Sequence, residues 1–188
     1  RRGESISRRL PAALPERVRM RAIILAAGMG TRLKHLTENL PKGMLSFQGK
    51  PLLERQIDLL KRHVDDIVVV RGYRADAIDI PGIRTVDNPD FADTNMVHSL
   101  LCARNDLEGD VLICYSDILY EERVLQAAMQ SAADLGVVYD TDFQEYWQAR
   151  LGDEADEDNE SFMVRSGLVT ALGKPHPAAE EMDGRYVG

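Results

Sequence analysis

Short apolar runs alternate with longer amphipathic segments after residue 20, and this alternation limits the possible folds more than any other feature of the chain. The short runs are rich in Val, Ile and Leu and end at glycine or polar residues, which is typical of buried strands. The longer segments carry apolar side chains at helical spacing. The predicted strands are 21–27, 66–70, 109–115 and 135–139, and the predicted helices are 51–63, 94–105 and 121–133. This order predicts an α/β fold whose mostly parallel sheet has helices on both faces.

The pattern changes after Asp140, where a β-hairpin is predicted from 162–164 and 168–172 with its turn at Ser166–Gly167. Ligands of parallel α/β sheets bind at the carboxyl ends of the strands. The loops 28–42 and 115–120 follow two of these ends, so a site is expected there.

Length and composition indicate one domain of ordinary globular type. The chain has 188 residues, of which 44% are hydrophobic and 29% charged. No apolar run reaches the roughly 20 residues of a membrane-spanning helix, so we expect a soluble cytoplasmic protein without stable membrane insertion. Two cysteines, Cys102 and Cys114, are too few for a disulfide framework and are expected to be buried free thiols.

Charge is unevenly distributed along the chain. Residues 1–21 contain seven arginines and two glutamates, a net charge of +5, whereas the remaining residues carry −13 and the whole chain −8. An acidic body of this kind argues against nucleic acid as a partner. We expect residues 1–19 to be a basic extension or linker ahead of a domain at 20–188; an arm that binds RNA or an anionic membrane is the alternative.

The loop after the first predicted strand combines glycines with two basic side chains. Gly28 and Gly30 let the backbone approach a ligand closely, and their amides can point toward an anion. Arg32 offers a planar set of donors to phosphate oxygens, and Lys42 adds a compact positive charge. This combination suits a polyphosphate, although a plain strand-to-loop turn with surface charges would look the same. The loop lacks the Gly-Lys-Ser/Thr of a P-loop and the third glycine of a dinucleotide fingerprint.

A carboxylate, Asp117, follows the predicted strand 109–115. At the carboxyl end of a strand it is well placed to bind a divalent cation together with nucleotide oxygens. The alternative is that Asp117 caps the helix predicted at 121–133.

Three segments together resemble the signature of the sugar-nucleotide pyrophosphorylase-like nucleotidyltransferases. They are Leu25-Ala26-Ala27-Gly28-Met29-Gly30-Thr31-Arg32, Pro41-Lys42-Gly43-Met44 and Gly49-Lys50-Pro51-Leu52. The resemblance implies a Rossmann-like sheet, a glycine loop that wraps a nucleoside triphosphate, catalytic Arg32 and Lys42 on its phosphates, and Mg²⁺ bound by Asp117. It also implies a nucleotide site made of Leu25, Ala26, Ala27, Gly28, Met29, Gly30, Thr31, Asn95 and Ser116. A second metal-binding carboxylate of this family is expected beyond Gly188, which would make the domain at 20–188 incomplete at its C-terminal end.

Further motifs look like the phosphocholine cytidylyltransferase branch, which includes aminoethylphosphonate cytidylyltransferases. They are Thr94-Asn95-Met96, Ser99-Leu100, Ser116-Asp117-Ile118-Leu119-Tyr120, Asp140 with Trp147 and Arg150, Glu160, Gly173-Lys174-Pro175 and Gly184-Arg185-Tyr186-Val187-Gly188. The sugar-specific branch usually has Glu-Lys-Pro where this chain has Gly173-Lys174-Pro175. The branch implies CTP as the nucleotide and phosphocholine, phosphoethanolamine or aminoethylphosphonate as the acceptor.

The predicted acceptor site lies in the C-terminal part of the chain. Tyr146 or Trp147 could place an aromatic face beside an ammonium group, a contact worth ~0.5–2 kcal/mol, although an aromatic side chain here is more often part of a core. Asp140 or Glu160 could add a countercharge. Lys174 could meet the acceptor phosphate; the alternative is an exposed residue leaving a strand.

We therefore expect a Mg²⁺-dependent nucleotidyltransferase that joins CTP to a small phosphorylated or phosphonate acceptor and releases pyrophosphate. Two alternatives are a uridylyl- or thymidylyltransferase acting on a sugar 1-phosphate, and a nucleotide-binding regulatory module without turnover. The sequence leaves the oligomeric state open.

Overall fold

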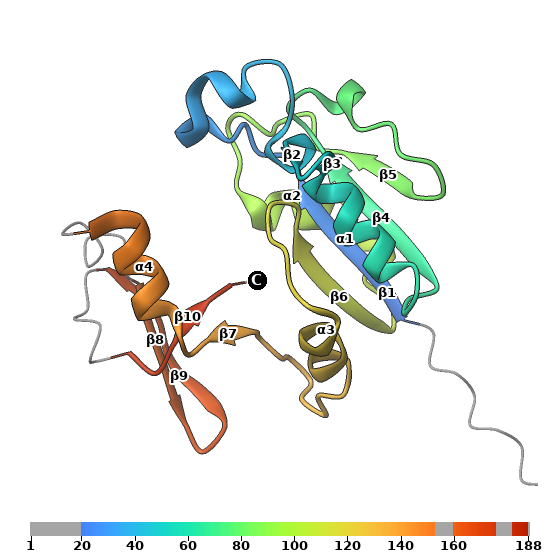
Figure 1. Ribbon diagram of the computed structural model, residues 1–188. Helices are drawn as coiled ribbons and strands as arrows, with labels where there is room; N and C mark the ends of the chain where they lie inside the picture. Colours follow the sequence, from blue (N-terminus) through green and yellow to red (C-terminus); the bar gives the residue numbers. More distant parts are fainter. Residues whose placement is uncertain (1–19, 153–159, 176–181, 188) are drawn as a thin grey trace, which may run out of the picture.

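A four-stranded parallel sheet forms the centre of the N-terminal part of the molecule (Figure 1). The computed structural model describes residues 20–152, 160–175 and 182–187. The strands of this sheet, in the spatial order β5-β4-β1-β6, are β5 (Arg84–Asp87), β4 (Asp66–Arg71), β1 (Met20–Ala26) and β6 (Asp110–Tyr115). The predicted parallel α/β architecture is confirmed.

Three α-helices and several short elements surround this sheet. The helices are α1 (Leu52–Leu60), α2 (Met96–Cys102) and α3 (Glu122–Met129). The short elements are the 3-10 turns η1 (Thr31–Thr37), η2 (Lys42–Met44), η3 (Ala75–Ala77) and η4 (Arg104–Asp106) and the small hairpin β2 (Ser46–Phe47) and β3 (Lys50–Pro51).

Helices cover both faces of the sheet because successive strand residues point to opposite sides. On one face, Ile24 of β1 and Val69 of β4 cluster with residues of α1 and α3. On the other face, Ile23 and Val68 cluster with residues at the C-terminal end of α2. All four of these strand side chains are fully buried. The layer order therefore follows from the continuous apolar character of the strands, as the sequence predicts.

A second group of elements, here called the C-terminal unit, follows α3. It consists of β7 (Tyr139–Asp140), α4 (Phe143–Leu151), β8 (Glu160–Arg165), β9 (Leu168–Pro175) and β10 (Arg185–Tyr186). Strands β8 and β9 form the predicted hairpin, whose two turn residues have positive φ angles of 52° and 78°, and β10 pairs antiparallel with β7. The ring of Tyr139 stacks on buried Phe162 with centroids 4.9 Å apart, which joins the two small sheets.

The structure corrects several sequence predictions. The strand predicted at 135–139 is wrong: Leu135 is 85% exposed, and in the described residues only Tyr139–Asp140 pairs with another strand. Helix α2 begins after Asn95, whose side chain accepts hydrogen bonds from the backbone of Val97 and His98, and not after Thr94.

The predicted helices are also longer than the observed ones, which end at Leu60, Cys102 and Met129. Both cysteines are free, but only Cys114 is buried, since Cys102 is partly exposed. In the part of the chain that the structure describes, no helix is both long and apolar enough to cross a membrane.

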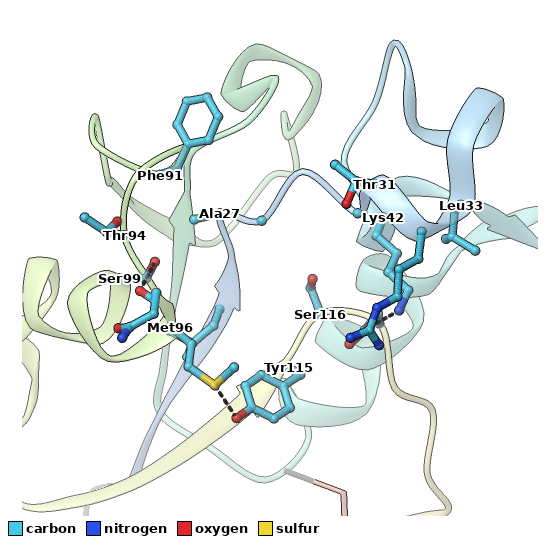
Figure 2. A pocket seen from close by; sticks show the side chains of 16 residues that line it. Ala27, Thr31, Leu33, Lys42, Phe91, Thr94, Met96, Ser99, Tyr115 and Ser116 are labelled. Atoms are coloured by element: carbon cyan, nitrogen blue, oxygen red, sulfur yellow. Dashed lines mark hydrogen bonds and ion pairs between the residues drawn. The ribbon is translucent and has the colours of Figure 1, made fainter. Parts of the chain in front are cut away.

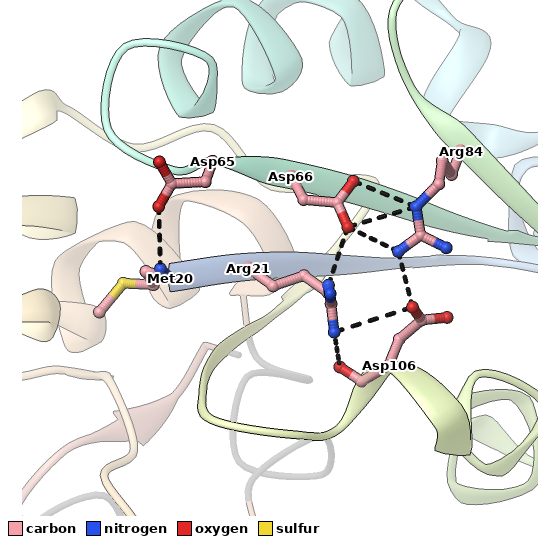
Figure 3. Close-up of polar contacts among 6 residues, drawn as sticks. All are labelled: Met20, Arg21, Asp65, Asp66, Arg84 and Asp106. Carbon is pink, nitrogen blue, oxygen red and sulfur yellow. Dashed lines mark hydrogen bonds and ion pairs between the residues drawn. The ribbon is translucent and has the colours of Figure 1, made fainter. Parts of the chain in front are cut away.

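A polar network fastens the amino-terminal end of the sheet (Figure 3). The Asp66 carboxylate on β4 accepts hydrogen bonds from Arg21 of β1 at 2.8 Å and from Arg84 of β5 at 2.6 Å. Both arginines also bond Asp106 of η4, Arg84 to its carboxylate at 2.6 Å and Arg21 to its backbone oxygen at 2.9 Å. These bonds thus connect β1, β4 and β5 with η4, which precedes β6, at the end of the sheet where β1 begins.

Asp66→Asn should destabilise the fold in a pH-dependent way. The hydrogen bond from Arg84, reinforced by Arg21, lowers the pKa of Asp66 below its usual value of 3.8. Its contribution to stability is therefore fully present above pH 3.8 and is lost as the pH falls through the lower folded-state pKa. We expect urea denaturation to show a loss of about 1 kcal/mol in the free energy of unfolding at pH 7 and a smaller loss toward pH 3.

Asp65→Asn is the matched control for this prediction. Asp65 accepts a hydrogen bond from the backbone nitrogen of Met20 at 3.2 Å and contacts neither arginine of the network in the described structure. Equal losses for Asp66→Asn at both pH values would contradict the ionic role of this carboxylate.

Candidate active site

A cavity of about 410 Å³ opens at the carboxyl ends of the strands (Figure 2). This volume lies within the range of about 300–1,000 Å³ that is usual for small-molecule sites. Ten of the predicted site residues line it: Leu25, Ala27, Gly28, Gly30, Thr31, Arg32, Lys42, Asn95, Ser116 and Asp117. Residues from four separate segments of the sequence are thereby brought together.

The other predicted site residues lie elsewhere. Ala26 is buried in the cluster beneath α1, and Met29 is 37% exposed and outside the cavity lining. Asp140 and Trp147 belong to the C-terminal unit. The side chains of Tyr146, Glu160 and Lys174 lie outside the described part of the structure, so their predicted roles stay predictions.

The glycine loop turns back on itself at Gly30, which has a φ of 61°. Its carbonyl oxygen accepts hydrogen bonds from the backbone of Leu33 and from the buried Thr37 hydroxyl, both at 3.0 Å. A Cβ at position 30 would lie 3.2 Å from Thr37 and 3.3 Å from the Cβ of Lys42. Glycine at position 30 therefore allows the loop to lie close against the segment that carries Lys42.

Lys42 and Asp117 form an ion pair at one end of the cavity, which Arg32 also lines. Their segments meet because Gly43 packs directly against Ser116, where a Cβ on Gly43 would lie 2.9 Å from the Cβ of Ser116. Ser116 is buried, and its backbone nitrogen bonds the carbonyl oxygen of Leu25 at 3.2 Å. The predicted catalytic lysine and the predicted metal ligand are therefore neighbours in space, although 75 positions separate them in the sequence.

A third loop, residues 88–95, forms the opposite wall, and of this loop the sequence analysis assigned only Asn95 to the site. Asn88 is only 1% exposed, and its side chain donates hydrogen bonds to Thr94 at 3.1 Å and to Ser99 at 3.0 Å. The Thr94 hydroxyl in turn donates to the carbonyl oxygen of Asp90 at 2.7 Å. The buried side-chain amide of Asn88 therefore fixes the conformation of this loop against the start of α2. The turn sequence Asn88-Pro89-Asp90 was the available signal, since it follows a strand, but that strand was not predicted.

The cavity has two chemically different ends, with Ala27 between them (Figure 2). Arg32, Lys42 and Asp117 supply charges at one end. The other end has aromatic, thioether and small polar side chains. The lining residues that the sequence analysis did not assign to the site are Leu33, Phe91, Thr94, Met96, Ser99 and Tyr115. Such a cavity can hold a ligand with a polyanionic end and a flat, hydrogen-bonding end.

Tyr115 connects the cavity to the C-terminal unit. Its hydroxyl donates to the Met96 sulfur at 2.8 Å and lies 3.4 Å from the hydroxyl of Tyr186. Burial, together with the hydrogen bond to Tyr186, raises the pKa of Tyr115 well above its usual value, so this phenol stays protonated at neutral pH.

Two observations bear on the predicted cation-binding groups. In the described residues no three metal-ligating side chains gather, so Asp117 is the carboxylate that the cavity offers. In the C-terminal unit the guanidinium of Arg185 lies 3.5 Å from the centre of the Trp147 ring, which is therefore already stacked against a cation.

Comparison with known proteins identifies similar chains. The profile described as "MobA-like NTP transferase domain" matches residues 22–173. The CTP:phosphoglutamine cytidylyltransferase of Campylobacter jejuni is 32% identical over 183 residues, which cover 90% of this chain and 71% of that protein. The choline-phosphate cytidylyltransferase of Streptococcus pneumoniae is 35% identical over 140 residues, which cover 72% of this chain and 60% of that protein.

A solved structure of a CTP:phosphocholine cytidylyltransferase from Streptococcus pneumoniae matches with a TM-score of 0.60 and 28% identity. The match covers 85% of this chain and 68% of that one. These similarities confirm the resemblance inferred from the sequence motifs, including its cytidylyltransferase branch, and the nucleotidyltransferase fold.

Gly43→Ala should destabilise the junction between Lys42 and Asp117. The added methyl group would lie 2.9 Å from the Cβ of Ser116 and 3.0 Å from both its carbonyl oxygen and its Oγ. Overpacking of this kind costs about 1–3 kcal/mol, so we expect a lower melting temperature. Gly28→Ala is the control, because a Cβ there has no atom within 4 Å, and its melting temperature should hardly change. Equal melting temperatures for the two variants would show that the close packing of Gly43 is unimportant.

Proposed function

Because this chain belongs to the MobA-like NTP transferase family, we propose that it transfers a cytidylyl group from CTP to the phosphate or phosphonate of a small acceptor. Pyrophosphate is the second product. The names of the two similar cytidylyltransferases support CTP as the donor and a small phosphorylated compound as the acceptor.

The observation that carries this proposal is the two-ended cavity. Arg32 and Lys42 at one end suit the triphosphate, and their positive charges offset the repulsion between two anionic reactants. The walls formed by Phe91, Asn95 and Ser99 suit the nucleoside. A ligand lying across Ala27 would reach both ends, and its α-phosphorus is proposed to lie near the carboxyl end of β1.

The proposed reaction is a displacement at this α-phosphorus. An acceptor phosphate oxygen forms a bond to the phosphorus, while the bond from the phosphorus to the bridging oxygen of pyrophosphate breaks. The second pKa of a phosphate monoester is about 6, so the attacking group is already largely ionised at neutral pH and needs no general base. Positioning of the reactants and neutralisation of charge are then the main tasks of the side chains.

Mg²⁺ is proposed as the cofactor, with Asp117 as its ligand from this chain. One carboxylate fits this ion, because Mg²⁺ commonly takes one or two protein carboxylates and completes its shell with water and substrate phosphates. When bound, the ion supplies additional neutralisation of the triphosphate charge. Lys42 now neutralises Asp117, so in the proposed complex Lys42 exchanges this carboxylate for a phosphate oxygen.

The acceptor is proposed to bind in the C-terminal unit. Asp140 and Trp147, together with Tyr146, Glu160 and Lys174, remain the proposed contacts. The guanidinium of Arg185 covers one face of Trp147. The ammonium of an amino-alcohol phosphate would therefore either displace this guanidinium or approach the ring from another side, and the acceptor preference depends on which arrangement is stable.

A pyrophosphate-release screen tests the proposal. The protein is incubated with Mg²⁺, each of CTP, UTP and dTTP, and each of phosphocholine, phosphoethanolamine, aminoethylphosphonate, phosphoglutamine and glucose 1-phosphate. We expect release with CTP and one or more of the first four acceptors. Release only with glucose 1-phosphate and UTP or dTTP would identify a sugar nucleotidyltransferase. Nucleotide binding without release in any combination would favour a regulatory module.

Lys42→Ala should lower kcat at least ~10²-fold with little effect on the fold, because one preorganised charge contact to a transition state is commonly worth about 2.7–4 kcal/mol. Lys50→Ala is the matched control. It removes a lysine that is also paired with an aspartate, Asp58, but that lies outside the cavity lining. We expect steady-state pyrophosphate release by Lys50→Ala to match the unsubstituted protein. A Lys42→Ala rate equal to that of the control would remove Lys42 from the site.

A further inference from the structure

The C-terminal unit touches the cavity through a pair of tyrosines. Tyr115 is the last residue of β6 and lines the cavity, and Tyr186 is the last residue of β10. Their rings meet edge to face, with centroids 6.2 Å apart and an angle of 88° between the planes. Their hydroxyl groups are 3.4 Å apart.

The two hydroxyl groups continue into the cavity wall. Tyr115 donates its proton to the sulfur of Met96, so its oxygen is available as an acceptor for the hydroxyl of Tyr186. Met96 is the first residue of α2 and lines the nucleoside end of the cavity. A continuous set of contacts therefore leads from this end, through Tyr115, to β10.

Strand β10 also reaches the proposed acceptor residues. Its two residues have opposite environments: Tyr186 contacts Tyr115, whereas Arg185 stacks on Trp147 and stands opposite Asp140 in the strand pairing. Neighbouring residues of a strand point to opposite sides, so only one peptide unit separates the contact with Tyr115 from the contact with Trp147.

We propose that Tyr186 is a positioning residue that couples the nucleoside end of the cavity to the C-terminal unit through the hydroxyl of Tyr115. This inference rests on the proposed function. Nucleotide contacts with Met96 and Tyr115 set the position of Tyr186, and β10 then sets Arg185 and Trp147 for the acceptor. Bound nucleotide therefore raises the affinity for the acceptor, and by thermodynamic linkage bound acceptor raises the affinity for the nucleotide by the same factor.

Trp147 gives a direct readout of this coupling, because it is the single tryptophan of the chain. Titration with CTP in the presence of Mg²⁺, without acceptor, should change its fluorescence, although the residue is outside the cavity lining. Isothermal calorimetry under the same conditions measures CTP binding independently. The comparison uses Tyr186→Phe, which keeps the ring and removes the hydroxyl.

Tyr139→Phe is the matched control, because Tyr139 is the strand-pairing partner of Tyr186 and its ring stacks on Phe162 away from the cavity. We expect the control to keep the full fluorescence change and Tyr186→Phe to lose most of it, while the CTP dissociation constants of both stay within about threefold of the unsubstituted protein.

In turnover assays Tyr186→Phe should raise the acceptor KM or lower kcat, with little change in the KM for CTP. Tyr115→Phe should reproduce the fluorescence loss, and the double variant should lose no more than either single one.

The outcomes separate the two proposals. CTP binding without a Trp147 response in the unsubstituted protein, or equal responses from Tyr186→Phe and Tyr139→Phe, would overturn the coupling and leave the proposed function intact. No calorimetric binding of CTP would overturn the proposed donor and the coupling with it. Melting temperatures of all variants establish that a lost response reflects the missing hydroxyl and not unfolding.

Discussion

The central strand β1 determines where everything else in the N-terminal part can lie. Its residues Ala22, Ile23 and Ile24 are fully buried, and it pairs in parallel with β4 on one side and with β6 on the other. Parallel pairing brings the carboxyl ends of these strands to one edge of the sheet. The glycine loop and the Ser116–Asp117 segment therefore emerge at the same edge, and together with the loop 88–95 after β5 they surround the cavity. The opposite edge holds only the polar network around Asp66 among the features described above.

Sequence reasoning succeeded where a local pattern determines both structure and chemistry. The run 21–27 reads as a buried strand from composition alone, and the Gly28–Arg32 loop after it carries recognisable glycines and a cation. It failed for β5, because three of its four residues are exposed and its place in the sheet depends on pairing with β4. Most of the wall at 88–95 was missed with that strand, although Asn95 was predicted, since the importance of Asn88 appears only when its amide is buried against Thr94 and Ser99.

The C-terminal unit shows a different limit of prediction. Trp147 stood out in the sequence beside Tyr146, but its neighbour in space, Arg185, is 38 positions further along the chain. Likewise, nothing in the sequence pairs Tyr115 with Tyr186, because no periodicity connects the end of one sheet with a two-residue strand of another. Long-range contacts between side chains of different units determine how the two units meet, and no local sequence pattern predicts such contacts.

The ion pair between Lys42 and Asp117 has a consequence for ligand discrimination. Because Asp117 already neutralises Lys42, this end of the cavity attracts an anion more weakly than an unpaired lysine would. A lone anion that takes Lys42 leaves the aspartate uncompensated, and a lone cation that takes Asp117 does the same to the lysine. In the proposed complex, a metal-bound polyphosphate brings both signs of charge and would replace both partners of the ion pair at once. Under the proposed function, this ion pair therefore disfavours the binding of orthophosphate, free pyrophosphate or a bare metal ion relative to the binding of a metal-bound triphosphate.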